Sequence, residues 1–259
     1  MFLVLNKEKI ISFFIASSAV ILLFVFATSF NANDKNETTT IVSNNISKQL
    51  PIYSVDTNDA KIALTMNCAW NADDIESILE TLKKHNCQIT FFVVGDWVDK
   101  YPDAVKKITD AGHEIGNHSD THPHVNNINL ENNINQIKKC SDKVEKITGK
   151  KTFLYRAPYG EYNNTVIEAS KNANHIAIQW SIDSLDYNSL TCEQMWERIE
   201  PKLSNGSILL MHNGTENTAL SLDTLLTNIE SKGFKIVKIS DLIYLNNFTI
   251  DNNGIQHKK

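Results

Sequence analysis

The stretch KIALTMNCAWNADDIESILETLKKHNCQITFFVV, residues 61–94, decides the fold of this chain. It begins with an apolar and β-branched run, Lys61–Met66, and ends with another, Gln88–Val94. Between the two runs, the apolar positions of an amphipathic helix are filled by Ile75, Ile78, Leu79 and Leu82. A strand, a helix and a second strand in this order predict two parallel strands joined by a crossover.

The same alternation continues to about residue 245. Further strands are predicted at Glu114–Asn117, Thr152–Tyr155, Ile176–Trp180, Ser207–Met211 and Phe234–Val237. Helices are predicted from apolar positions over Val98–Ile108, Leu130–Ile147, Glu193–Leu203, Leu222–Ile229 and Asp241–Leu245, and Gly149 is placed to end the longest of them. Roughly seven such strand–helix units predict an α/β barrel, although an open doubly wound sheet has the same local pattern.

Composition narrows the class of protein. The chain has 259 residues, of which 42% are hydrophobic, so it can build a full core and is not disordered as a whole. A formal net charge of −5 argues against a nucleic-acid partner, which would require a basic surface. The four cysteines include no CxxC pair, which argues against a structural zinc knuckle.

The N-terminus carries a location signal. Lys7 and Lys9 precede an apolar run over Ile10–Phe30, long enough to cross ~30 Å of hydrocarbon. It predicts a single-pass membrane anchor over residues 1–30, with the rest of the chain outside the cytosol. The trio Ala27–Ser29 resembles a cleavage site, so secretion is the alternative.

The remaining domain boundaries follow from composition. An Asn-, Thr- and Ser-rich stretch predicts a flexible linker over residues 31–55, and the working domain is assigned to residues 56–246. Residues 247–259 are assigned to a polar tail.

Polar side chains follow the C-terminal ends of the predicted strands, where the βα loops of a barrel build its active site. They are Asn67, Cys68, His118, His122, Arg156, Asp183, Asp186 and His212. The histidines at 118 and 122 have i, i+4 spacing, which on a helical turn would aim both imidazoles at one point. Neutral imidazoles suit zinc, although surface or capping histidines have the same spacing.

Five ordered motifs resemble the NodB-homology polysaccharide deacetylases of carbohydrate esterase family 4, over roughly Ile62 to Leu245. They are TMNCAW (65–70), in the place of the family's TFDDGP, His118-x-x-x-His122, RAPY (156–159), Asp183-x-x-Asp186-Tyr187 and LMH (210–212). The resemblance implies a distorted (β/α)7-type barrel that removes acetyl groups from an N-acetylated glycan, peptidoglycan or a chitin-like polymer, with a divalent metal such as zinc.

The resemblance also implies a role for each matched residue. His118 and His122 would be metal ligands, and His212 would be the general acid, oriented by Asp186. Arg156 would hold the catalytic base, and the backbone N–H of Tyr159 would stabilise the oxyanion.

The first motif departs from the family pattern. The family's general base is replaced by Asn67, whose amide cannot accept a proton at neutral pH, a loss that typically costs ~10²–10⁴-fold in rate. The family's third metal ligand is replaced by Cys68, which either completes a Cys-His-His zinc site or is a buried apolar residue. This degenerate motif, with the Ala-Trp that follows, resembles sporulation-type members.

Other groups could take the place of the base. Asp73 and Asp74 begin a predicted helix, where a capping role is the alternative, and Glu161 follows RAPYG. A zinc-bound water needing little base assistance is a further option.

Three functions are therefore open. The first is a membrane-anchored, metal-dependent N-deacetylase of cell-wall glycan. The second is a catalytically weak relative that binds glycan or an envelope partner. The third is a zinc-dependent hydrolase for another substrate.

Overall fold

The computed structural model describes residues 48–259, so the predicted anchor and most of the predicted linker lie outside the described residues. Within residues 48–259, no helix combines the length and the apolar character that a membrane span requires.

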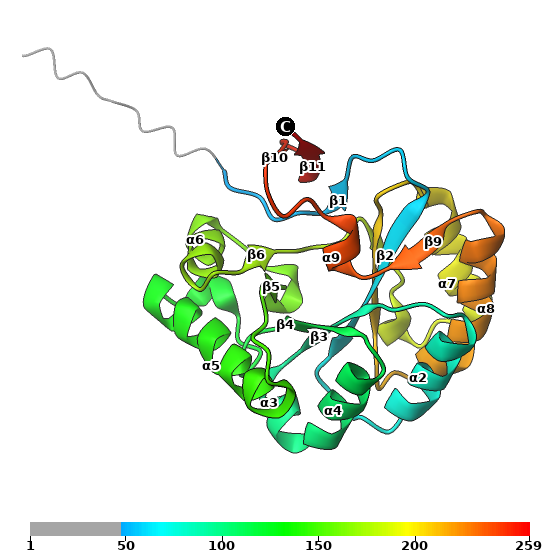
Figure 1. The fold of residues 1–259 in the computed structure, drawn as a ribbon, viewed down its shortest axis with the longest axis horizontal. Coiled ribbons are helices and arrows are strands. Elements are labelled where there is room, and N and C mark those ends of the chain that lie inside the picture. Colours follow the sequence, from blue (N-terminus) through cyan, green and yellow to red (C-terminus); the bar gives the residue numbers. More distant parts are fainter. Residues whose placement is uncertain (1–47) are drawn as a thin grey trace, which may run out of the picture. The chain divides into compact units, whose positions relative to one another are not determined.

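Strand β2 (Lys61–Cys68) is the centre of a curled parallel sheet (Figure 1). It pairs with β3 (Thr90–Val93), β8 (Ile208–His212) and β9 (Lys235–Val237), all in parallel. The sheet continues from β3 through β4 (Glu114–Asn117), β5 (Leu154–Tyr155) and β6 (Ile176–Ala177), and from β8 to β7 (Ile182–Asp183). The predicted parallel α/β architecture is confirmed, and the strands curl in the manner of a distorted barrel.

The strand predicted at Ile176–Trp180 is shorter in the structure, where β6 covers only Ile176–Ala177, and the strand β7 at Ile182–Asp183 was not predicted. Strand β6 pairs with β5, and the chain then crosses to pair with β8 as β7. The N-terminal segment lies alongside this crossing, because the Ile52 N–H donates to Ala177 O and the Val55 N–H donates to Gly206 O. The end of the predicted linker is therefore part of the folded domain, with Ile52 and Val55 buried.

Helices surround the outer side of the sheet, except for the short α9 (Ile239–Leu242), which packs on its inner side (Figure 1). The others are α2 (Ile75–Lys84), α3 (Gly95–Lys100), α4 (Pro102–Asp110), α5 (Leu130–Thr148), α6 (Asn164–Asn172), α7 (Cys192–Ile199) and α8 (Thr218–Ser231). Helix α5 ends at Gly149 in the left-handed conformation, as predicted. Helix α6 was not predicted; it is short, and the side chain of Asn163 caps its start by accepting from the Val166 N–H.

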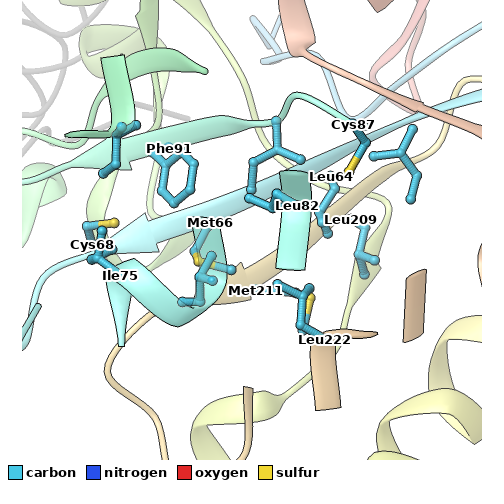
Figure 2. Close-up of a cluster of buried hydrophobic side chains, with 14 of the residues drawn as sticks. Leu64, Met66, Cys68, Ile75, Leu82, Cys87, Phe91, Leu209, Met211 and Leu222 are labelled. Atoms are coloured by element: carbon cyan, nitrogen blue, oxygen red, sulfur yellow. The ribbon is translucent and has the colours of Figure 1, made fainter. Parts of the chain in front are cut away.

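The alternation of side chains along β2 separates two cores. Leu64, Met66 and Cys68 point outward to the helices and pack with residues of α2 and α8, as Figure 2 shows. Ala63 points inward and packs with Phe92 and the residues of α9. Thr65 and Asn67 continue the inward row toward the C-terminal end of the strand. Because both faces are buried, β2 reads as a nearly continuous apolar run.

The predicted polar tail is an ordered hairpin. Strands β10 (Phe248–Ile250) and β11 (Ile255–Lys258) pair in antiparallel fashion, and β11 also pairs with β1 (Ser54–Val55). Because both ends of the described chain meet in this small sheet, the folded unit extends beyond residues 56–246 to cover Lys48–Lys259. Single turns of 3-10 helix complete the structure at Val125–Asn127, Pro158–Gly160, Asp186–Asn188 and Glu200–Lys202.

Candidate functional site

A cavity of about 480 Å³ lies at the C-terminal ends of the strands, in the size range of small-ligand sites. It is lined by Asn67, Ala69, Trp70, His118, His122, Tyr159, Gly160, Trp180, Asp183, Tyr187, Leu210 and His212. Two more predicted site residues, Arg156 and Asp186, are fully buried and hydrogen-bond to this lining. The structure therefore brings together every predicted site residue except Cys68.

A larger cavity, about 1020 Å³, lies at the opposite end of the strands. Its lining mixes lysines with carboxylates and includes His113, whose pKa burial lowers to about 4. None of the predicted site residues reaches it, so the smaller cavity is the candidate site.

One side of this pocket is formed by His212 at the end of β8. Its backbone N–H donates to Asp186 Oδ2 (2.6 Å), and its Nδ1 lies 2.9 Å from Asp186 Oδ1. Because a carboxylate only accepts, Nδ1 carries the proton and Nε2 is left for the pocket. Thr218, the first residue of α8, donates its hydroxyl to Asp186 Oδ2 (2.7 Å). This third partner of the carboxylate was missed from the sequence.

The loop that carries His212 is tied to the loop after β2. Asp74 Oδ2 accepts from the Gly214 N–H (2.7 Å), and Asp74 Oδ1 accepts from Asn213 Nδ2 (3.1 Å). Asp74 occupies the N-cap position of α2, as predicted, but its side chain makes no capping hydrogen bond to the helix. Neither Asp74 nor the exposed Asp73 lines the pocket, so neither is placed as a substitute for the base.

The imidazoles of His118 and His122 come close together, although the residues do not lie on the helical turn considered from their spacing. They lie on an irregular loop in which Ser119 (φ 72°) and His122 (φ 55°) adopt the left-handed conformation, which is costly for residues with a side chain. Gln136 of α5 compensates, because its Oε1 accepts from Ser119 Oγ and from the backbone N–H groups of Asp120 and Thr121, each at 2.9 Å. No local signal in the sequence points to this long-range contact.

The two imidazoles are 4.9 Å apart between ring centroids, with planes at 75°. His118 Nδ1 lies 2.7 Å from Arg156 O, a carbonyl that only accepts, so Nδ1 carries the proton and Nε2 faces the pocket. Burial lowers the pKa of both histidines, that of His118 well below its usual value. Neutral imidazoles with free nitrogens are suitable for metal binding.

Cys68 is not a third ligand in this structure. Its side chain is on the outward face of β2, in the apolar cluster with Ile75 (Figure 2). Burial raises the pKa of its thiol well above the usual value, which opposes the thiolate that zinc requires. Within residues 48–259, no group of three or more His, Cys, Asp or Glu side chains is placed to hold a metal. The donor set therefore does not fit a three-ligand zinc site.

Arg156 is fully buried beside Asn67. Its Nη1 donates to Thr65 Oγ1 (2.8 Å) and Asn67 Oδ1 (3.1 Å), and its Nη2 donates to Gln179 O (3.1 Å). Among the described residues it has no carboxylate partner in an ion pair, and its Nε has no hydrogen-bond partner. Burial accordingly lowers its pKa to about 9. The guanidinium that should hold a carboxylate base holds a neutral amide.

Tyr159 projects from the loop after β5. Its backbone is left-handed (φ 58°), and its ring is 58% exposed between His122 and His124, with centroids 4.5 Å and 4.3 Å away. Glu161 Oε1 lies 2.7 Å from His124 Nδ1, and Glu161 does not line the pocket. It is therefore occupied elsewhere and is not placed as a substitute base.

The comparisons with known proteins agree with these motifs. The family profile described as polysaccharide deacetylase matches residues 54–178. The chain is 32% identical to BA3943 of Bacillus anthracis, described as a pseudoenzyme of carbohydrate esterase family 4, with a TM-score of 0.72 over 81% of this chain and 73% of that one. This chain belongs to the polysaccharide deacetylase family.

Other relatives of this deacetylase-family protein include proteins described as deacetylases and an uncharacterised member. It is 32% identical to the uncharacterised protein YlxY of Bacillus subtilis, over 74% of this chain and 60% of that one. It is 28% identical to a peptidoglycan-N-acetylglucosamine deacetylase of Bacillus cereus, over 76% of this chain and 73% of that one. A BA3943 mutant with restored enzymatic activity matches with a TM-score of 0.72, 33% identity, and coverage of 74% of this chain and 70% of that one.

Proposed function

We propose that this protein binds the amino-sugar glycan of the cell wall and hydrolyses it very slowly or not at all. The observation that carries the proposal is the pairing of Arg156 with Asn67. An amide stands where a deacetylase of this family has its base, in contact with the arginine that would hold it.

The rest of the pocket supports binding. The rings of Trp70 and Tyr187 flank His212, with centroids 5.4 Å and 5.2 Å from the imidazole. Both rings are about half exposed, and aromatic surfaces of this kind give large contact area at low entropic cost. Relatives described as peptidoglycan deacetylases support a peptidoglycan glycan as the ligand class.

A second candidate is a slow, metal-dependent N-deacetylase. It is favoured by the complete contact between His212 and Asp186, because a protein that only binds glycan has no need for a leaving-group acid. A role in sporulation, implied by the first motif, stays a prediction.

The proposed location is the outer face of the cell membrane, with the apolar run 10–30 as a single-pass anchor. The arrangement of the described residues is compatible with it. Residues 51–55 lie beside Gly206, just before β8, whereas the pocket lies at the far end of β8. The described chain therefore enters the folded unit at the end of the sheet opposite the pocket.

Two measurements on the full chain test the proposal. Sedimentation with purified peptidoglycan sacculi should retain the protein, and acetate release from the same sacculi, with and without zinc, should stay at background. Release that requires zinc and disappears in His212→Ala would establish the deacetylase instead. A folded protein that is not retained would overturn the binding function.

A further inference from the structure

The charge distribution of the pocket suggests which form of the glycan it takes, an inference that rests on the proposed function. Only one lining side chain, Asp183, is a carboxylate or a permanent cation. Its Oδ1 accepts from the Leu185 N–H (2.9 Å), and it forms no ion pair with any residue of 48–259. The pocket therefore presents a carboxylate that has no cationic partner in direct contact.

The two other full charges near the pocket lie behind its wall. Asp186 is fully buried and held by His212 and Thr218, whereas Arg156 is fully buried behind Asn67. The Arg156 charge does interact with Asp183 over a longer distance. Two carboxylates against one guanidinium still leave the site biased toward a cation.

Four aromatic rings also favour a positively charged ligand in the pocket. Trp70, Tyr159, Trp180 and Tyr187 all line the cavity. A ring face attracts a cation within about 6 Å of its centroid. Asp183 lies close enough to Tyr187 to raise the pKa of its phenol, after the larger effect of burial. The carboxylate and the aromatic surface therefore belong to one compartment.

An N-acetyl group would meet a less suitable environment. Its methyl group could pack on Leu210, the one branched aliphatic side chain of the lining. Its carbonyl oxygen requires donors, and His118 supplies none, because its Nε2 is left without a proton when Nδ1 donates to Arg156 O. Only neutral groups such as the Asn67 amide and the Tyr159 backbone N–H therefore remain. With Cys68 turned into the core, the residues present do not form the three-ligand metal centre that would polarise this oxygen.

We propose that the preferred ligand is a glycan with a free amine, that is, a de-N-acetylated hexosamine in β-linked chains, rather than its N-acetylated form. The ammonium group lies against the Asp183 carboxylate and the aromatic rings. The protein then binds glycan from which the acetyl group has already been removed. A hydrolytic N-deacetylation must therefore supply its ligand.

Calorimetry on the full chain tests this preference with two defined oligomers, tetraglucosamine and tetra-N-acetylchitotetraose, at a pH where the free amine is protonated. We expect tetraglucosamine to bind at least about tenfold more tightly. In Asp183→Asn this ratio should collapse toward one. Glu216→Gln removes the same charge from an exposed site outside the lining and should keep the ratio.

The outcomes separate the two proposals. Equal affinities, or tighter binding of the acetylated oligomer, overturn the amine preference and leave glycan binding intact. If neither oligomer binds and sacculi do not retain the protein, the proposed function itself fails. Sacculi treated with an active peptidoglycan deacetylase distinguish the source, because stronger retention after treatment assigns the ligand to peptidoglycan, and tighter binding of tetraglucosamine alone assigns it to a chitosan-like polymer.

Discussion

The two sides of the pocket are built to different degrees of completeness. On the His212 side, Asp186 accepts from three donors and every expected contact of an acid–carboxylate pair is present. On the Asn67 side, Arg156 is in place, but the side chain that it contacts is the amide of Asn67 and not a carboxylate. The difference teaches that an amide at position 67 keeps a hydrogen bond to Arg156 without supplying a group that accepts a proton.

On the same side, the position to which the resemblance assigns a metal ligand has an apolar environment. An outward-facing side chain at position 68 contacts the apolar cluster between β2 and the helices, and a cysteine fits there as a small apolar residue. Arg156, by contrast, keeps a buried positive charge without a carboxylate in contact, which is a costly arrangement.

The largest expected effect comes from introducing a carboxylate at position 67, beside Arg156. Asn67→Asp should place an acceptor for a proton beside Arg156 and raise zinc-dependent acetate release by ~10²–10⁴-fold over the wild-type rate. The rate is measured on acetylated chitin oligomers with the full chain. Asn67→Asp combined with His212→Ala serves as the control, and it should return to background.

The Asn67→Asp variant should also unfold at a higher denaturant concentration, because the buried guanidinium gains an ion-pair partner. A folded, more stable variant without acetate release would show that the missing ligand at position 68, and not the missing base, limits the reaction.

Substitutions on the His212 side of the pocket should lower the free energy of unfolding more than those elsewhere in the site. Asp186→Ala removes the acceptor of three donors, two of them on His212, and should lower the free energy of unfolding by about 3 kcal/mol. Urea unfolding followed by circular dichroism measures the loss. Thr218→Val removes one of these donors and should cost about 1 kcal/mol. Equal losses in the two variants would contradict the central place of Asp186.

The loop with His118 and His122 lies between the two sides, and Gln136 holds it. Gln136→Met keeps the length of the side chain but removes the oxygen that accepts four hydrogen bonds, three of them at 2.9 Å. The expected loss is about 1 kcal/mol of global stability, with a larger loss of amide exchange protection at Asp120 and Thr121. Unchanged protection at these two amides would show that the left-handed loop is stable without Gln136.

Local features of the fold and of the site could be predicted from the sequence, whereas features that depend on long-range contacts could not. The strands around Lys61–Met66 and Glu114–Asn117 were predicted because apolar and β-branched runs are local signals. The site was predicted because its residues follow strand ends. The roles of Gln136 and Thr218 could not be predicted, because each residue contacts the site only through the tertiary fold.

Two of the misses had a local signal. The Asn253–Gly254 dipeptide is typical of a hairpin turn, and it connects β10 and β11 in the segment assigned to a polar tail. The period of two along β2, continued for two residues beyond Met66, places Cys68 in the outward row with Leu64 and Met66. Helix α6 had neither a long apolar pattern nor a charged first turn to reveal it.

The smallest expected effect concerns this same cysteine. If Cys68 is only a core residue, Cys68→Ala should cost about 1 kcal/mol of stability, from lost contacts, and leave the zinc content of the purified protein unchanged. His118→Ala is the matched comparison, because its ring faces the pocket and any zinc that the protein carries should decrease. Inductively coupled plasma spectrometry gives the stoichiometry. A drop in Cys68→Ala equal to that in His118→Ala would mean that the thiol turns into the pocket when metal is present, and the two sides would then differ only by the base.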